Sequence, residues 1–372
     1  MRRRIVGVAT SAAALALVAA ACVPHASQDT LKPQGPEAHT IDNLFEPVFW
    51  FAVVPIFVLV EGALVWFSLR YRHRKGRTAP IPPQIHGNTR LEIAWTILPA
   101  VILAGVAVPT IATIWDLARK PPGPDVLNVE VLGHQWWWEF RYPDQKVDTA
   151  NVMHIPTGVP VYVSLCSAGG GYGNQPAPNE CQADLPVPSS LGGAVIHSFW
   201  VPALAGKQDV VPARTNHLIL QADHPGTYSG QCAEFCGLSH AYMRFKVVAQ
   251  TPDDFEQWVR DQQADAAQPT GLAAQGAGIF AQTCTRCHTI NGLKDAQGNP
   301  VPGAIEAPNL THLQSRDCFA GCTLDLNEQN LIRWVSNAPA LKPGSLMPSG
   351  LHELGLTPDQ VRAVVAYLMT LK

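Results

Sequence analysis

Charged residues are scarce in this chain of 372 residues. They make up only 15% of the sequence, against 47% for hydrophobic residues, and the formal net charge is −3. A balance so close to neutral gives no electrostatic reason to expect a nucleic-acid partner. The shortage of charge in a chain of this length points instead to membrane-spanning segments within a protein of two or three units.

Two long stretches are almost free of charge. Residues 48–69 contain one acid, Glu61, and residues 93–115 contain no charged residue. Each stretch exceeds the ~20 residues that cross a bilayer as a helix. The pattern therefore predicts a two-helix transmembrane hairpin over residues 44–117, with long buried core helices as the alternative.

The loop between these stretches has no acid. Residues 70–90 carry six basic side chains, which are Arg70, Arg72, Arg74, Lys75, Arg77 and Arg90. Basic loops remain on the cytoplasmic side. Both flanks of the hairpin, and everything after about Leu117, are therefore expected on the outer face of a bacterial cell membrane.

The N-terminus agrees with this orientation. Three arginines precede an apolar run that ends in Ala-Ala-Ala-Cys22, which predicts a signal peptide over residues 1–22. The end of the run resembles the processing site of bacterial lipoproteins. Cys22 is therefore a candidate for lipid attachment, with simple cleavage nearby as the alternative.

Short alternating runs begin after residue 124. They cover residues 126–132, 136–142, 159–165, 195–200, 217–221 and 243–248, separated by Gly, Pro and Asn. Period-two alternation at this spacing predicts a small sandwich or barrel. We expect an all-β cupredoxin-like barrel of six to eight strands in Greek-key order over residues 124–250.

Soft metal ligands gather near the end of this region. Cys232, Cys236, His240 and Met243 combine two thiols, an imidazole and a thioether in one segment, and His197 offers a second imidazole. Such donors favour copper. A Cys232–Cys236 disulfide and a closed zinc site are the alternatives, but methionine is an unlikely zinc ligand.

A second redox motif follows. Cys284-Thr-Arg-Cys287-His288 has the attachment signature of a c-type haem, with two thioether bonds and His288 as an iron ligand. A thioredoxin-like pair is the alternative for the cysteines. Residues 342–348 resemble the methionine loop of cytochrome c, which implies Met347 as the second axial ligand, although Met153 and Met369 compete by residue type, and a Met/His pair raises the haem potential. Residues 271–372 resemble small class I cytochromes, which implies an all-α cytochrome c domain after a helix and linker at 251–270.

Together these motifs resemble subunit II of a caa-type cytochrome c oxidase. Residues 86–99 are similar to its second helix, and residues 197–202 and 231–243 to its copper-binding segments. The resemblance implies a binuclear copper centre, CuA, bridged by Cys232 and Cys236. His197 and His240 would each bind one copper. Met243 and the backbone carbonyl of Glu234 would be axial ligands.

The resemblance implies three further roles. The Glu234 side chain would bind a magnesium ion shared with subunit I. Glu92 would lie at the mouth of a proton channel. Trp136, in Gly133-His-Gln-Trp-Trp-Trp138, would be the residue through which electrons enter the copper centre. Ala194 departs from the family, in which many members have an aspartate that docks cytochrome c.

Two cysteine pairs are left over. Cys166 and Cys181 lie in a Gly- and Pro-rich insertion over residues 166–193, and Cys318 and Cys322 have no histidine or methionine close by. Since exported cysteines commonly form disulfides, we expect Cys166–Cys181 and Cys318–Cys322 pairs.

The expected function is that of the electron-accepting subunit of a respiratory, proton-translocating cytochrome c oxidase. Electrons from cytochrome c would pass through haem c and the copper centre to subunit I, where oxygen is reduced to water, and subunit III is a further expected partner. No catalytic acid, base or nucleophile is expected in this chain. The alternatives are a copper-containing nitric oxide reductase subunit and a membrane-tethered electron carrier. A quinol oxidase subunit would lack the copper ligands.

Overall fold

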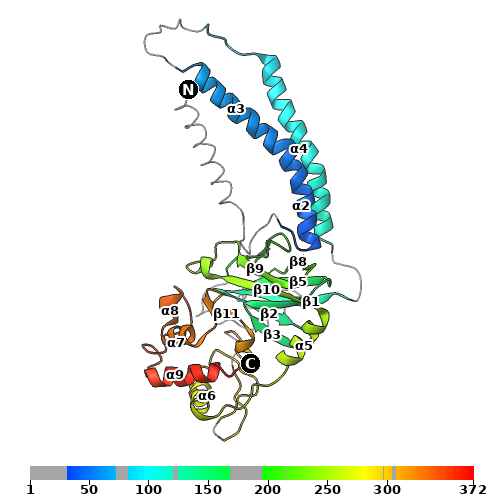
Figure 1. Cartoon of the computed structure of the whole chain (residues 1–372). Helices are drawn as coiled ribbons and strands as arrows, with labels where there is room; N and C mark the ends of the chain where they lie inside the picture. The colour runs from blue at the N-terminus through cyan, green and yellow to red at the C-terminus, as the bar shows by residue number, and fades with distance from the viewer. Residues whose placement is uncertain are drawn as a thin grey trace, which may run out of the picture.

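The computed structural model describes residues 32–72, 83–119, 125–167, 195–212, 214–295, 297–303 and 307–372. Along the chain, a pair of long helices is followed by a β-domain and then by a helical domain (Figure 1). This order confirms the predicted fold class. The expected signal peptide with Cys22, the insertion residue Cys181, and Ala194 lie outside the described residues.

The two apolar stretches form long helices that lie side by side near the β-domain (Figure 1). The first consists of α2 (Pro36–Val48), the π-helical turn η1 (Phe49–Val53) and α3 (Val54–Arg70), and the second is α4 (Thr89–Leu117). Their most apolar windows have mean hydropathies of 2.4 and 2.2, with none of their residues buried. A core helix buries its apolar face. Exposed side chains such as Phe51, at 85%, therefore favour membrane spans over core helices.

The base of this hairpin is bonded to the β-domain. The Gln34 amide donates to the Ala203 carbonyl at 2.7 Å, and the Asp223 amide donates to the Gln34 carbonyl at 2.8 Å. Glycine is required next to this contact, because a Cβ at Gly35 would lie 2.0 Å from the Gln221 carbonyl oxygen. The β-domain is thus held against the start of α2.

The β-domain contains two five-stranded sheets, with the orders β3-β2-β1-β5-β8 and β4-β10-β9-β6-β7. The strands are β1 (Leu127–His134), β2 (Trp137–Tyr142), β3 (Val147–Ala150), β4 (Val152–Pro156), β5 (Val161–Ser167), β6 (His197–Trp200), β7 (Gln208–Val210), β8 (Asn216–Leu220), β9 (Gly226–Cys232) and β10 (Arg244–Gln250). β1 pairs in parallel with β5, and β4 with β10. Trp138, Phe199 and Phe245 are fully or almost fully buried between the sheets.

The described strands outnumber the six to eight that the sequence predicts. The six predicted runs correspond to β1, β2, β5, β6, β8 and β10. Four strands were missed: β7, β3 and β4 have only three, four and five residues, and β9 reads Gly-Thr-Tyr-Ser-Gly-Gln-Cys. Such segments carry little periodic signal.

Helix α5 (Pro252–Gln262) packs onto the β-domain. Its N-cap, Thr251, accepts a hydrogen bond from the Asp254 amide through its side chain. Phe255 and Trp258 are buried with the β-domain core, and the Trp258 ring stacks on the His154 ring at 4.4 Å. The helix expected between the two domains therefore completes the core of the first.

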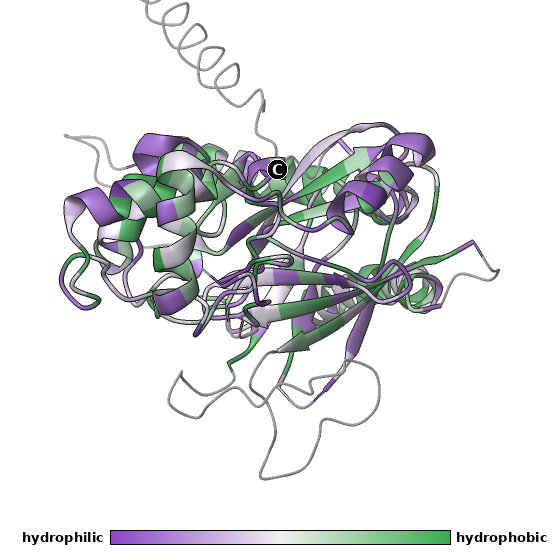
Figure 2. Cartoon of the chain, turned by 90° about the horizontal axis from the view of Figure 1, so that it is seen from below, coloured by the Kyte–Doolittle hydropathy of each residue, from purple (hydrophilic) through white to green (hydrophobic). Residues whose placement is uncertain are grey.

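The C-terminal domain is mainly helical. Its elements are α6 (Gly271–Thr283), β11 (Cys318–Phe319), β12 (Leu324–Asp325), α7 (Glu328–Ser336), α8 (Ala338–Leu341) and α9 (Pro358–Leu368). Helices α6 and α9 cross closely, because a Cβ at Gly276 would lie 1.9 Å from the Ala363 carbonyl oxygen. Figure 2 shows hydrophilic and hydrophobic residues mixed along the helices and strands of both domains, as expected for half-buried elements.

Candidate copper and haem centres

The predicted copper ligands come together in the β-domain. The Cys232 and Cys236 sulfurs are 3.8 Å apart. Cys232 Sγ lies 3.8 Å from His197 Nδ1, and Cys236 Sγ lies 3.6 Å from His240 Nδ1 and 3.8 Å from Met243 Sδ. The Glu234 carbonyl oxygen is 3.2 Å from Cys232 Sγ. A disulfide needs about 2.05 Å between its sulfurs, so the alternative of a Cys232–Cys236 disulfide does not describe this site.

Neighbouring strands and one loop position these donors. His197 starts β6, whose Phe199 pairs with Cys232 at the end of β9. The other donors follow in the loop from Cys232 to Met243. Gly133 makes room for the histidine, because a Cβ there would lie 2.8 Å from His197 Cδ2. The fold therefore brings a distant imidazole to a local thiol pair.

The burial, the thiol pKa values and the donor types of the cluster suit metal binding. Cys232, Cys236, His197 and Met243 are each at most 5% exposed. The hydrogen bond with Cys236, together with His197, lowers the pKa of Cys232, and the same pairing with Cys232 raises the pKa of Cys236, so one thiolate forms readily. Two cysteine sulfurs with imidazole and thioether donors on either side fit soft copper ions better than zinc. Because the cluster is buried, it leaves no open position for substrate chemistry.

The Cys284-to-His288 motif lines a cavity of about 440 Å³ in the C-terminal domain. The Cys287 and His288 amides both donate to the Cys284 carbonyl, at 3.1 and 3.0 Å, which folds the motif into a tight turn. His288 Nδ1 donates to the Pro308 carbonyl at 2.8 Å. This bond fixes the ring and leaves Nε2 available for a metal. Burial lowers the pKa of His288, which keeps the imidazole neutral.

Of the three candidate methionines, Met347 lines this cavity. Met153 is fully buried in the β-domain core. Met369 follows α9, and its sulfur accepts a hydrogen bond from Gln314 Nε2 at 3.5 Å. The wall also includes Leu310, Leu331 and Trp334, so its character is mainly apolar. These residues fit a haem held between His288 and Met347.

The copper cluster and the cavity are joined by two neighbouring side chains, Gln135 and Trp136. Trp136 lines the cavity, and its indole N–H donates to the Cys236 carbonyl at 2.9 Å. Sequence reasoning missed two residues at this junction. Gln135 donates to the same carbonyl at 2.8 Å, and Lys342 donates to the Trp136 carbonyl at 2.5 Å. The only sequence feature that could have pointed to them is their location: Gln135 directly precedes Trp136, and Lys342 begins the segment that leads to Met347.

The other side chains that the sequence singles out are not among the copper donors or the candidate haem ligands. Glu234 is exposed beside the copper ligands. Glu92 is exposed in the first turn of α4 and accepts a hydrogen bond from the Asn88 amide at 3.2 Å. Cys318 and Cys322 form a disulfide. Cys166 is disulfide-bonded, but the Cys166–Cys181 pairing remains a prediction.

A buried set of copper donors beside a cavity that carries a haem-attachment motif, on a chain with two long apolar helices, is the arrangement of a membrane-anchored electron-transfer protein. Family models agree. The transmembrane domain of cytochrome c oxidase subunit II matches residues 27–113, the periplasmic domain of that subunit matches residues 182–250, and cytochrome c matches residues 273–372.

Relatives that match most of the chain support the same family. The chain is 35% identical to cytochrome c oxidase subunit 2 of Alkalihalophilus pseudofirmus over 96% of this chain and 95% of the relative. It is 34% identical to the same subunit of Bacillus sp. strain PS3, over 81% and 80%. Quinol oxidase subunit 2 of Bacillus spizizenii is 32% identical, over 64% and 68%. The chain belongs to the cytochrome c oxidase subunit II family, and its β-domain and C-terminal domain are of the kinds that hold CuA and haem.

Proposed function

We propose that this chain is the electron-accepting subunit of a haem–copper cytochrome c oxidase, with its two globular domains on the outer face of the membrane. The observation that carries the proposal is the convergence of six copper donors beside a haem-sized cavity that shares Trp136 with them. When bound, haem c and CuA supply one-electron redox chemistry. Electrons from cytochrome c would pass through both to subunit I, which reduces oxygen.

In the copper centre, Cys232 and Cys236 would bridge two ions, and His197 and His240 would each bind one. Met243 and the Glu234 carbonyl would be axial ligands. The 3.8 Å separation of the two sulfurs supports bridging, because it leaves room for metal on both sides of the sulfur pair. The buried surroundings exclude water and fix the ligands, so little needs to move when the charge changes.

In the cytochrome domain, Cys284 and Cys287 would bond covalently to haem c, and His288 and Met347 would hold its iron. The orienting bond from His288 to Pro308 supports this assignment. We assign the domains as follows: the anchor covers residues 44–117, the copper domain 124–250, the connecting helix and linker 251–270, and the cytochrome domain 271–372.

The copper loop would also contact subunit I. Phe235 and Leu238 are each 76% exposed, on either side of Cys236. Exposed apolar side chains that lie close together mark contact surfaces. Glu234 beside them would bind the shared magnesium, and Glu92 at the opposite end of the hairpin would lie at the proton-channel mouth. Subunit III would complete the complex.

Purification of the complex tests this function. We expect two coppers per chain with a delocalised EPR signal, one covalently bound haem c and oxygen uptake driven by reduced cytochrome c. Cys236→Ser should abolish the copper signal and leave the haem. A complex that reduced nitric oxide but not oxygen would assign the chain to the reductase alternative.

A further inference from the structure

Trp136 is covered by its own chain. Only 8% of its surface is exposed. The segment before Met347 lies against it, because a Cβ at Gly344 would be 2.6 Å from Trp136 Cη2. Ser239 of the copper loop donates to the Pro343 carbonyl in the same segment at 2.5 Å. The face of Trp136 that a soluble donor would need is therefore occupied by the cytochrome domain.

Lys342 begins the segment, residues 342–347, that covers Trp136, and it donates hydrogen bonds to both domains. Its ammonium donates to the carbonyls of Trp136, at 2.5 Å, and Tyr242, at 3.0 Å, in the copper domain. It also donates to the Ala320 carbonyl of the cytochrome domain, at 2.9 Å. Lys342 is only 4% exposed. A buried ammonium is unfavourable unless its hydrogen bonds are satisfied, and here satisfaction requires both domains to be in contact.

The loop that supplies the third carbonyl is shaped to fit the copper domain. Ala320, Gly321 and Cys322 all have positive φ, at 55°, 72° and 50°, next to the Cys318–Cys322 disulfide. The Arg244 amide of β10 donates to the Gly321 carbonyl at 3.1 Å. A Cβ at Gly321 would lie 2.2 Å from the Tyr242 carbonyl oxygen. Glycine therefore permits a contact that any side chain would push apart.

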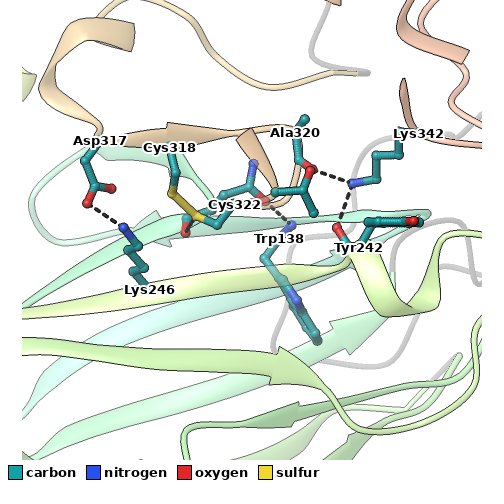
Figure 3. Close-up of a disulfide and its surroundings, with 10 residues drawn as sticks. Trp138, Tyr242, Lys246, Asp317, Cys318, Ala320, Cys322 and Lys342 are labelled. Carbon is teal, nitrogen blue, oxygen red and sulfur yellow. Dashed lines mark hydrogen bonds and ion pairs between the residues drawn. A yellow bond between two sulfur atoms is a disulfide. The ribbon is translucent and has the colours of Figure 1, made fainter. Parts of the chain in front are cut away.

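An ion pair lies at the edge of this contact. Lys246 Nζ on β10 is 2.5 Å from Oδ2 of Asp317, the first residue of the disulfide loop (Figure 3). Both side chains are partly exposed, so the pair contributes little energy. Its exposure has an experimental use, because an amine and a carboxylate in contact can be joined by a carbodiimide only while the domains are docked.

We propose that Lys342 and the disulfide loop, residues 317–322, form a docking lock that holds the cytochrome domain over Trp136. The partner of this surface is the chain's own cytochrome domain, and Lys342 acts as a positioning residue. The lock closes Trp136 to soluble donors, so electrons reach the copper centre only through the haem of this chain. The electron-route part rests on the proposed function, whereas the docking itself does not.

Carbodiimide cross-linking of the purified, cofactor-loaded complex tests the lock. Mass mapping should find a Lys246–Asp317 amide bond in the unaltered chain. Lys342→Met removes three hydrogen bonds, two of which cross to the copper domain. The loss of one such bond shifts an equilibrium by about tenfold. We therefore expect the cross-link yield and the haem-to-copper electron-transfer rate to fall by about tenfold or more, with both metal spectra retained.

Lys294→Met is the matched control, because Lys294 is an exposed lysine of the same domain, and it should behave like the unaltered chain. An unchanged yield and rate in Lys342→Met would overturn the proposal. If Lys342→Met lost its methionine–iron band, Gly321→Ala would decide by the same two measurements, since its added Cβ separates the domains at Tyr242. Absence of copper or haem from the unaltered chain would refute the proposed function and leave the cross-link result standing.

Discussion

The indole N–H of Trp136 donates a 2.9 Å hydrogen bond to the backbone carbonyl of Cys236. Cys236 lies in the cluster of copper donors, and the same tryptophan lines the cavity that contains Cys284 and His288. This hydrogen bond, and the one that Gln135 donates to the same carbonyl, therefore connect the walls of the two sites. The connection exists because the cytochrome domain packs against the copper domain at this point.

Replacing Trp136 by phenylalanine should slow electron transfer between the two centres several-fold. The substitution keeps an aromatic ring and removes the N–H that contacts the Cys236 carbonyl. We expect unchanged copper EPR and haem spectra, with the rate followed by flash reduction of the haem. Trp137→Phe is the control, since Trp137 stacks on His134 at 4.0 Å. Equal rates in the two variants would exclude Trp136 from the route.

Replacing Met243 by leucine should alter the copper centre without unfolding the domain. A volume-conserving swap in a core costs less than about 1.5 kcal/mol, and the two thiolates and two imidazoles remain. We expect retained copper content with a changed EPR signal and reduction potential. Met153→Leu is the matched control, because Met153 is also fully buried but lies away from the copper donors. The ligand assignment would be wrong if both variants kept the original signal.

The sequence predicts the site residues that lie close together along the chain. It misses the contacts that form where the two domains pack together. Cys232, Cys236, His240 and Met243 share one loop, so connectivity alone keeps their donors close. His197 is 35 residues from Cys232, and its ligand role came from a family resemblance. The bond from Lys342 to Trp136 spans 206 residues. No hydrophobic period or motif spacing encodes such a contact, because it depends on how two separately folded cores meet.

Replacing Met347 by leucine should leave the haem covalently attached but remove an iron ligand. Since a Met/His pair raises haem potential, the potential should fall and the methionine–iron absorption band should disappear. Redox titration of the purified complex measures both changes. Met369→Leu is the control, because the Met369 sulfur contacts Gln314 outside the cavity wall. Loss of the band in Met369→Leu alone would reverse the assignment.

His154 should make the copper domain less stable in mild acid. Its ring is stacked on Trp258 at 4.4 Å, and its Nδ1 lies 2.8 Å from Gln250 Oε1. Burial lowers the pKa of His154 from 6.5 to about 4. Between these values the unfolded state binds a proton that the folded state does not. The free energy of unfolding should therefore fall as pH drops from about 6.5, and this contribution should level off near pH 4.

The full effect is about 3 kcal/mol, because each unit of pKa difference is worth about 1.4 kcal/mol. His154→Gln keeps a hydrogen-bonding side chain and removes the titration, so it should flatten the pH dependence across this window. Denaturant unfolding of the purified chain at a series of pH values measures the slope. His224→Gln, at an exposed histidine, should retain the original slope. If His154→Gln also retained it, His154 would not be the buried group that resists protonation.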